Sequence, residues 1–241
     1  MRANISVCMA SYNGSLYITE QISSILEQLI PGDELVIVDD CSTDDTIDIV
    51  KSFKSEYIKL AINTKNIGHV KTFEKALMLA KRDYICFTDQ DDIWIDNRLE
   101  NLYNSLKNEK VLLVASNFRV NNESESEIKF LKLKNENSAD LFGNILRIFE
   151  GKSAYYGCTM MMDKKLKKYI LPFPSYIEAH DLWIAICANF LKSIHHLDDD
   201  TLIYRVHHNN ASLKKRNFTQ KLIARYYFCK NILTILKRIN D

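Results

Sequence analysis

Two acidic clusters each follow a short apolar run, and their composition suits the binding of a divalent cation. Asp39-Asp40 follows the run at 35–38, and Asp89-Gln90-Asp91-Asp92 follows the run at 84–87. Three carboxylates within four residues repel one another unless a cation or another partner compensates their charge. Carboxylate oxygens at a rigid strand end suit Mg²⁺ or Mn²⁺ shared with a substrate phosphate. The second cluster therefore predicts a metal site, whereas Asp39-Asp40 alone could equally well be a turn or a helix cap.

Two segments further along the chain could complete such a site. Asp181 lies at the start of a helical pattern, where it could be a general base in a crevice or simply a first-turn acid of the helix. His207 directly follows a strand-like run at 201–206. Lone histidines are mostly structural or solvated, but a histidine just past a strand end could add a nitrogen ligand to the carboxylates.

Other well-known metal and phosphate sites do not match these residues. Asp89, Asp91 and Glu100 have EF-hand spacing, but Ile93 and Trp94 stand where that loop needs an oxygen ligand and a glycine. The first apolar run is followed by Ala10-Ser11-Tyr12-Asn13-Gly14, which is not the GxGxxG of a dinucleotide site. A phosphate-binding GxxxxGK[ST] loop is also absent from the sequence.

The elements that must position these residues alternate between strands and helices. The sequence predicts buried strands at 5–9, 35–38, 58–62, 84–87 and 111–114, because these runs are almost continuously apolar. Apolar residues at helical spacing predict helices at 18–29 and 73–80, and Thr43-Asp44-Asp45-Thr46 is typical of the start of another helix. This alternation favours an α/β fold with a mostly parallel, doubly wound sheet. Ligands of such sheets bind outside the carboxyl ends of the strands, where both acidic clusters lie.

The second half of the chain has a mixed pattern. Residues 121–137 are rich in Glu, Ser, Lys and Asn, which indicates a surface excursion. We expect a helix near 139–149, a strand near 155–162, a helix at about 180–191 and a strand at 201–206. A long basic helix is predicted at about 219–238.

Composition limits the class of protein. The 241 residues are 46% hydrophobic and 26% charged with a formal net charge of +1, which excludes disordered, collagen-like and disulfide-framework proteins and argues against a nucleic-acid partner. The six scattered cysteines are expected to be reduced and mostly buried in a cytosolic protein. Neither a secretory signal nor an apolar run approaching the ~18 residues of a membrane span is expected.

Charge is unevenly distributed along the chain. From Leu213 onward it has eight Lys or Arg residues and one acid, Asp241. The basic residues are Lys214, Lys215, Arg216, Lys221, Arg225, Lys230, Lys237 and Arg238. This tail could be a solvated helix packed on the domain by Leu222, Ile223, Tyr226, Phe228, Ile232 and Leu236, or it could dock on an anionic membrane surface.

In their order and spacing the motifs resemble the family-two inverting glycosyltransferases of the GT-A fold. The matching segments are 7–14, 36–44, 66–68, 87–94, 180–183 and 204–207. The resemblance covers residues 4 to about 108 well and continues more sparsely to about 212. It implies a glycosyltransferase domain at 1–212, with a nucleotide-sugar half at 1–118 and an acceptor half at 119–212, followed by a basic amphipathic helix at 213–241.

The resemblance also implies a role for individual residues. Asp181 would be the catalytic base, Asp91 the main metal ligand and Asp40 the partner of the base imide. The nucleotide sugar would contact Ala10, Tyr12, Asp40, Asn66 and Asp89, the metal would be held by Asp89, Asp91 and His207, and the acceptor would lie near Gly157, Trp94, Trp183 and His180. In relatives a glycine is common after the late histidine, whereas this chain has His208.

The expected activity is a metal-dependent, inverting transfer of a hexose to a lipid-linked saccharide in bacterial O-antigen or polysaccharide synthesis. The donor would be UDP-glucose, UDP-galactose or dTDP-rhamnose, the cofactor Mn²⁺ or Mg²⁺, and the location the cytoplasm or the inner membrane surface. One alternative is a sugar-phosphate nucleotidylyltransferase, although the first strand lacks the glycine-rich basic loop that holds a triphosphate. The other is a receiver-like signalling domain, although the paired acids follow the second strand rather than the first.

Overall fold

The computed structural model describes residues 2–121, 130–152, 154–207 and 217–240. The strands within these residues are β1 (Ile5–Ser11), β2 (Glu34–Asp39), β3 (Ile58–Ile62), β4 (Tyr84–Thr88), β5 (Ile93–Trp94), β6 (Leu113–Val120), β7 (Met160–Asp163) and β8 (Ile194–Tyr204). The α-helices are α1 (Ile18–Leu26), α2 (Thr46–Ser52), α3 (His69–Leu79), α4 (Arg98–Asn108), α5 (Leu141–Glu150), α6 (Lys167–Ile170), α7 (His180–Phe190) and α8 (Phe218–Asn240). Short 3-10 helices are η1 (Asn135–Asn137), η2 (Gly157–Thr159) and η3 (Lys164–Leu166).

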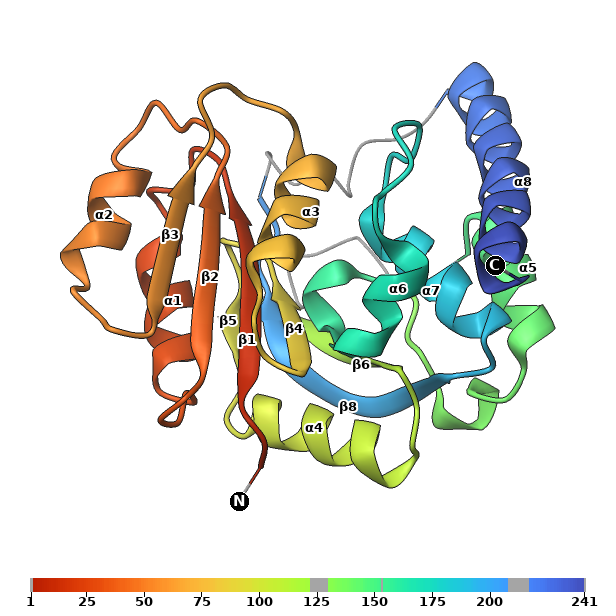
Figure 1. Cartoon of the computed structure of the whole chain (residues 1–241), viewed down its shortest axis with the longest axis horizontal. Coiled ribbons are helices and arrows are strands. Elements are labelled where there is room, and N and C mark those ends of the chain that lie inside the picture. The colour runs from red at the N-terminus through yellow and green to blue at the C-terminus, as the bar shows by residue number, and fades with distance from the viewer. Residues whose placement is uncertain (1, 122–129, 153, 208–216, 241) are drawn as a thin grey trace.

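These strands form a single mixed sheet in the order β3-β2-β1-β4-β7-β6-β8-β5. The first four strands are mutually parallel, as predicted. β7 runs antiparallel to both β4 and β6, and β5 runs antiparallel to β8. The sheet is therefore less parallel than the sequence suggested. Figure 1 shows it curling from β3 to the long, curved β8.

Both faces of the parallel half of the sheet are buried, because successive strand residues point to opposite sides. In β1, Cys8 joins one apolar cluster with residues of α3, α6 and α7, whereas Val7 and Met9 join another with residues of α1, α2 and α4. The apolar residues of β2 and β4 alternate between the same two clusters. This two-sided burial explains the near-continuous apolar runs, and it holds the carboxyl ends of the strands on a rigid frame.

The termini of several predicted elements differ from the structure. β8 begins at Ile194 rather than 201, because the polar segment before 201 extends the pairing with β6. The strand expected at 155–162 is shorter, since 157–159 form the turn η2 ahead of β7. α2 begins at Thr46 rather than Thr43, because the carboxylate of Asp44 instead accepts hydrogen bonds from the backbone N–H groups of Ser15 and Thr46. The sequence analysis did not identify α4, α6 or β5.

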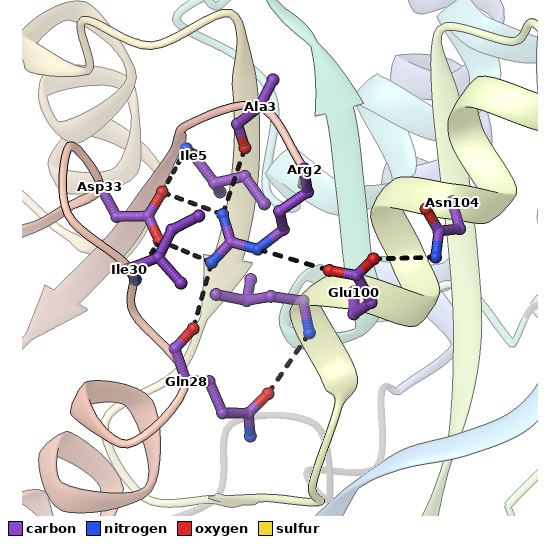
Figure 2. A network of polar contacts seen from close by, with 9 residues as sticks. Arg2, Ala3, Ile5, Gln28, Ile30, Asp33, Glu100 and Asn104 are labelled. Atoms are coloured by element: carbon purple, nitrogen blue, oxygen red, sulfur yellow. Dashed lines mark hydrogen bonds and ion pairs between the residues drawn. The ribbon is translucent and has the colours of Figure 1, made fainter.

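A buried network of ion pairs and hydrogen bonds stabilises the end of the sheet that lies opposite the carboxyl ends of the parallel strands (Figure 2). The Arg2 guanidinium donates to both carboxylate oxygens of Asp33, at 2.9 and 2.6 Å, and to the carbonyl of Gln28. Asp33 also accepts from the backbone N–H of Ile5, and Arg2 lies 3.9 Å from Glu100 of α4. These contacts join the start of β1, the α1–β2 loop and α4, and so stabilise the frame far from the acidic clusters.

The predicted C-terminal helix is present as α8, and it packs on α6 and α7. Its Ile235 is buried, Phe228 packs against the same apolar cluster, and Arg238 donates to the carbonyls of Tyr169 and Ile170. Leu222 and Tyr226, expected to pack, are instead 53% and 64% exposed. In the part of the chain that the structure describes, no helix has both the length and the apolar character required to cross a bilayer.

Some sequence-based expectations concern residues outside the described ranges. They are the surface excursion over 122–129, the His208 position and the cations Lys214, Lys215 and Arg216. Of the cysteines, Cys8, Cys86, Cys158 and Cys187 are buried, as predicted, whereas Cys41 is partly exposed and Cys229 is exposed.

Candidate active site

A cavity of about 560 Å³ opens at the carboxyl ends of β1, β2 and β4. Nine residues singled out from the sequence line it: Ala10, Tyr12, Asp40, Asn66, Asp89, Asp91, Gly157, His180 and Asp181. They come from strand ends, from the β3–α3 loop, from η2 and from the first turn of α7. The fold thus brings together residues that are as much as 171 positions apart in the sequence.

The loops after β1 and β4 are joined by Gln90. Its side-chain amide accepts from the backbone N–H of Tyr12 at 2.9 Å and donates to the Tyr12 carbonyl at 3.1 Å. A side chain at Gly14 would overlap the Gln90 amide, so only glycine permits this approach. The acidic segment and the Tyr12 wall of the cavity are therefore held in one arrangement.

The paired acids Asp39 and Asp40 have different environments. Asp39 is fully buried and accepts from the hydroxyls of Ser11 and Ser42 and from the Ser42 backbone N–H, so it acts as a turn residue. Asp40 lines the cavity and fixes the β3–α3 loop.

The Asp40 carboxylate accepts hydrogen bonds from Asn63 Nδ2 at 2.8 Å, Ile67 N at 2.9 Å and Gly68 N at 2.8 Å. Gly68 has φ of +84°, a conformation that strongly favours glycine. The Asn66-Ile67-Gly68 motif thus forms the support of an acid at the cavity wall.

The acidic segment after β4 concentrates negative charge. Burial, together with repulsion from Asp91 and Asp181, raises the pKa of Asp89 to about 7. Asp91 Oδ2 lies 2.9 Å from His207 Nε2, and the His207 ring stacks on Tyr17 at 4.7 Å. The structure thus brings the late histidine to the acid that the sequence paired with it.

Asp92 is the most buried acid of this segment, and the sequence analysis assigned it no role. Burial and the neighbouring Asp89 and Asp91 raise its pKa well above the usual range. The Cys158 thiol and the Arg205 backbone contact its carboxylate and lower its pKa, but burial and the neighbouring acids outweigh them. Ligand atoms of Asp89, Asp92 and Cys158 lie within 4.8 Å of one another.

The carboxylates of the segment after β4, together with the His207 imidazole, fit a hard divalent cation. Carboxylate and imidazole groups are suitable ligands for Mn²⁺ or Mg²⁺, whereas a thiol is a poor one. Burial and the charges of Asp92 and Asp89 raise the pKa of Cys158 well above its usual value, so its thiol stays protonated. The closely spaced acids are undercompensated by protein groups, and a bound cation would relieve their repulsion.

Asp181 faces this cluster from the first turn of α7. Its Oδ1 accepts from the Leu182 backbone N–H at 2.7 Å, and burial raises its pKa above the usual value. The adjacent His180 stacks on Phe73 at 4.1 Å. Burial, together with the neighbouring His69, lowers the pKa of His180 to about 3, so its ring is neutral. A Cβ at Gly157 would lie 2.6 Å from His180 Nε2, which explains the glycine.

Two residues expected to contact an acceptor do not line the cavity. Trp94 is 4% exposed, and its Nε1 donates to Thr88 Oγ1 at 3.1 Å. Trp183 is fully buried, and its Nε1 donates to the Ile170 carbonyl at 3.0 Å. The expectation for both was wrong, because each indole packs in the core and satisfies its N–H there.

The cavity also contains residues that the sequence analysis missed or left without a role. They are Gln90, His69, Tyr156, Cys158, Glu178 and Tyr204. Gln90 lies inside the acidic motif and His69 directly follows the Asn66-Ile67-Gly68 motif, so a signal existed for both. Tyr204 begins the matching segment 204–207, whereas Tyr156, Cys158 and Glu178 lie in segments whose pattern does not distinguish a cavity wall from the core.

Comparison with known sequences identifies the family. Residues 6–170 match the family described as Glycosyl transferase family 2, so the chain belongs to this family and is a glycosyltransferase. A dTDP-rhamnosyl transferase RfbG of Shigella flexneri is 28% identical over 97% of this chain and 85% of its own length. The UDP-Glc:alpha-D-GlcNAc-diphosphoundecaprenol beta-1,3-glucosyltransferase WfaP of Escherichia coli is 31% identical over 88% of this chain and 80% of its own.

Solved structures confirm the predicted GT-A type of fold. TarS 1–349 of S. aureus, in complex with UDP-GlcNAc, has a TM-score of 0.70 at 22% identity and covers 98% of this chain and 72% of its own. The mannosyltransferase PcManGT of Pyrobaculum calidifontis, in complex with GDP-Man and Mn²⁺, has a TM-score of 0.64 at 20% identity and covers 100% and 75%. At such identities the likeness concerns the fold.

Proposed function

We propose that the chain transfers a hexose from a nucleoside-diphosphate sugar to a hydroxyl of a lipid-linked saccharide, with inversion at the anomeric carbon. One observation carries this proposal: Asp181 lines the same cavity as Asp40 and the acidic segment after β4. A base, a nucleotide-binding acid and a cation site thereby surround a space of about 560 Å³.

The donor nucleoside is proposed to lie between Tyr12 and Asp40. Three hydrogen bonds from the β3–α3 loop fix the Asp40 carboxylate at the wall. Since a carboxylate has about four acceptor positions, one remains for an N–H of the base. Ala10 and Asn66 line the same side of the cavity and are assigned to the nucleotide sugar with them.

Asp181 is proposed as the catalytic base. It would take the proton of the acceptor hydroxyl while that oxygen bonds to the anomeric carbon and the bond from this carbon to the diphosphate oxygen breaks. The sugar passes through an oxocarbenium-like state. Burial raises the pKa of Asp181 and makes its carboxylate a stronger base than an exposed aspartate. The nucleoside diphosphate leaves with the bonding electrons, so an acid catalyst is not needed on that side.

Asp91 and Asp89 are proposed to hold the divalent cation, with His207 as a further ligand. When bound, Mn²⁺ or Mg²⁺ would neutralise the charge that develops on the leaving diphosphate. The raised pKa of Asp89 is consistent with this assignment, because it reflects burial first and then the neighbouring charges of Asp91 and Asp181, which a bound cation would balance.

The names of the relatives support the choice of donor and acceptor. One is a dTDP-rhamnosyl transferase and one transfers glucose from UDP-Glc to a diphosphoundecaprenol-linked sugar. We propose dTDP-rhamnose, UDP-glucose or UDP-galactose as the donor and a diphosphate-linked saccharide of bacterial O-antigen or polysaccharide synthesis as the acceptor. The basic α8 would bring the enzyme to the inner face of the cell membrane.

The test is a screen of UDP-, dTDP- and GDP-sugars for donor hydrolysis and transfer, with Mn²⁺, with Mg²⁺ and with EDTA. Asp91→Ala should abolish metal-dependent turnover in a folded protein, whereas Asp96→Ala should not, because Asp96 is an exposed acid outside the cavity. Asp181→Asn should keep donor affinity and stop transfer. Near-normal transfer by a folded Asp181→Asn variant would refute its role, and pyrophosphate release from nucleoside triphosphates would instead indicate a nucleotidylyltransferase.

A further inference from the structure

A second cavity, of about 550 Å³, adjoins the cavity of the candidate active site at Asp181. Its walls come from α5, from α7 with the preceding segment, and from α8. It shares Tyr156, Glu178, Ala179 and Asp181 with the donor cavity, so the two adjoin at the proposed base. An acceptor that presents a hydroxyl to Asp181 from the side opposite the donor would occupy this second cavity.

The wall formed by α8 is basic. Lys221 and Arg225 line it and are four residues apart, so they lie on one face of the helix. The Arg225 guanidinium lies 5.5 Å from the Phe149 ring centre and donates to the Lys221 carbonyl. Among the described residues, neither cation forms an ion pair with a carboxylate.

A third cavity gives a contrast to Lys221 and Arg225, because its own cations are all paired with acids. It is lined by Lys132, Lys134, Arg147 and Lys152, and each of these cations is paired with an acid: Asp200, Glu136, Asp140 and Glu150 respectively. Its charge is thus already balanced. In the cavity next to Asp181, Glu150 is paired with Lys152, and the acids Glu178 and Asp181 lie at the wall shared with the donor cavity, whereas the cations lie on α8.

A polar atom on α8 also faces this space. Asn231 lines the cavity, and its Oδ1 is buried with no hydrogen-bond partner among the described residues. A buried acceptor atom without a donor is costly, so a ligand that brings a hydroxyl would relieve it. Tyr227 and Phe228 next to it offer ring surfaces of the kind that line sugar-sized ligands.

We propose that this second cavity binds the diphosphate group of the acceptor, with Arg225 and Lys221 as its cations and Asn231 as an acceptor of a sugar hydroxyl. The inference rests on the proposed function, and it names the part of the acceptor that α8 recognises. An arginine and a lysine held on one helix face give charge-assisted hydrogen bonds to phosphate oxygens. The sugar then lies between the basic wall and Asp181, which orients its hydroxyl toward the base.

The test measures the affinity of the full chain for decyl diphosphate by calorimetry in EDTA, so that a metal cannot bridge the probe to the acids. Arg225→Gln and Lys221→Gln should each weaken binding about tenfold, as the loss of one charge-assisted contact implies. Lys237→Gln is the matched control, since it removes one charge from the same helix outside the cavity, and it should change binding less than about twofold. No measurable binding by the wild type would overturn the proposal.

Further measurements distinguish binding of the diphosphate in the second cavity from binding in the donor cavity and at a membrane surface. Inorganic pyrophosphate should compete with decyl diphosphate, and the affinity for UDP with Mn²⁺ should be the same in Arg225→Gln and the wild type. If Asp91→Ala, but not Arg225→Gln, weakened decyl diphosphate, the probe would be bound in the donor cavity and the proposal would fail. Equal loss of binding to phosphatidylglycerol vesicles in Arg225→Gln and Lys237→Gln, without a change for decyl diphosphate, would assign the cations to the membrane surface.

This design separates the inference from the proposed function. The binding assay contains no sugar donor, so an enzyme that hydrolysed and transferred no nucleotide sugar could still show the Arg225-dependent site. Conversely, transfer activity with a decyl diphosphate affinity that Arg225→Gln leaves unchanged would overturn the inference alone. With a diphosphate-linked acceptor, Arg225→Gln should raise the acceptor KM far more than it lowers kcat.

Discussion

Gly157→Ala adds one methyl group beside a buried ring that leaves too little room for it. The new Cβ would lie 2.6 Å from His180 Nε2 and 3.1 Å from His180 Cε1. The His180 ring is buried and stacks on Phe73 at 4.1 Å, so it cannot swing away from the methyl group. The strain must therefore move η2 or the start of α7.

The cost follows from this geometry. Overpacking of this kind destabilises a protein by about 1–3 kcal/mol. His180 and Asp181 are the first two residues of α7, so a shift that relieves the clash also displaces the proposed base. Because a misplacement of about 1 Å can lower turnover about 100-fold, we expect activity to fall more than stability alone would explain.

A double-mutant cycle with His180→Ala isolates the clash. The free energy of unfolding in urea is measured for the wild type, Gly157→Ala, His180→Ala and the double variant. In the His180→Ala background the Gly157→Ala substitution should cost less than about 0.5 kcal/mol, because the overlapping ring is gone. If Gly157→Ala destabilised both backgrounds equally, contact with His180 would not be the reason for the glycine.

Three further predictions concern charge. The pKa of Asp89 is raised from 3.8 to about 7 by burial and by Asp91 and Asp181. The native state therefore binds this proton more tightly than the unfolded chain does. As a result, the metal-free protein loses stability as pH rises from about 4 to about 7. In EDTA, Asp89→Asn should accordingly raise the Tm above pH 7 but not near pH 4; a gain independent of pH would contradict this. Asp40→Asn should weaken donor binding nearly as much as Asp40→Ala in a calorimetric titration, because the amide N–H₂ that replaces one carboxylate oxygen cannot accept from the backbone N–H facing it, that of Gly68 or that of Ile67, and so disrupts the loop; wild-type affinity in Asp40→Asn would refute it. Arg2→Met should lower the free energy of unfolding by about 3–5 kcal/mol, because it leaves the charge of Asp33 buried without an ion-pair partner. The kcat per folded molecule should stay unchanged. A selective loss of kcat would show that this distant network affects the site.

The common location of the proposed donor residues could be predicted because they follow strands that are buried on both faces. In β2 the four residues before the acids, 35–38, are all apolar, and parallel strands end at one edge of the sheet. Asp40, Asp89 and Asp91 could therefore be placed together from their position in the chain alone. The support that Gln90 and Gly68 give them depends on side-chain contacts between loops, which no local pattern encodes.

The strands of the second half were predicted less well for a related reason. β8 pairs with β6 through residues such as His195 and His196, whose polarity hides the strand, and their burial depends on neighbours distant in sequence. His196 Nε2 lies 2.7 Å from the Tyr155 hydroxyl and the ring is buried, although histidine as a residue type is only intermediate in its tendency to be buried. Tertiary contacts rather than local propensity decided these elements.

On the proposed acceptor side, the residue type alone does not tell whether an aromatic side chain lines a cavity or packs in the core. Trp183 and Tyr227 are both aromatic residues on helices, and both types are suited to stack on a sugar. Trp183 faces the core and donates to the carbonyl of Ile170, whereas Tyr227 lines the cavity next to Asp181. Helical spacing gives both residues an inward direction, but only the docking of α8 on α7 determines whether that direction meets packed side chains or a cavity. A sequence can therefore place the proposed base at the start of α7, while the groups proposed to hold its substrate become visible only once the helices are assembled.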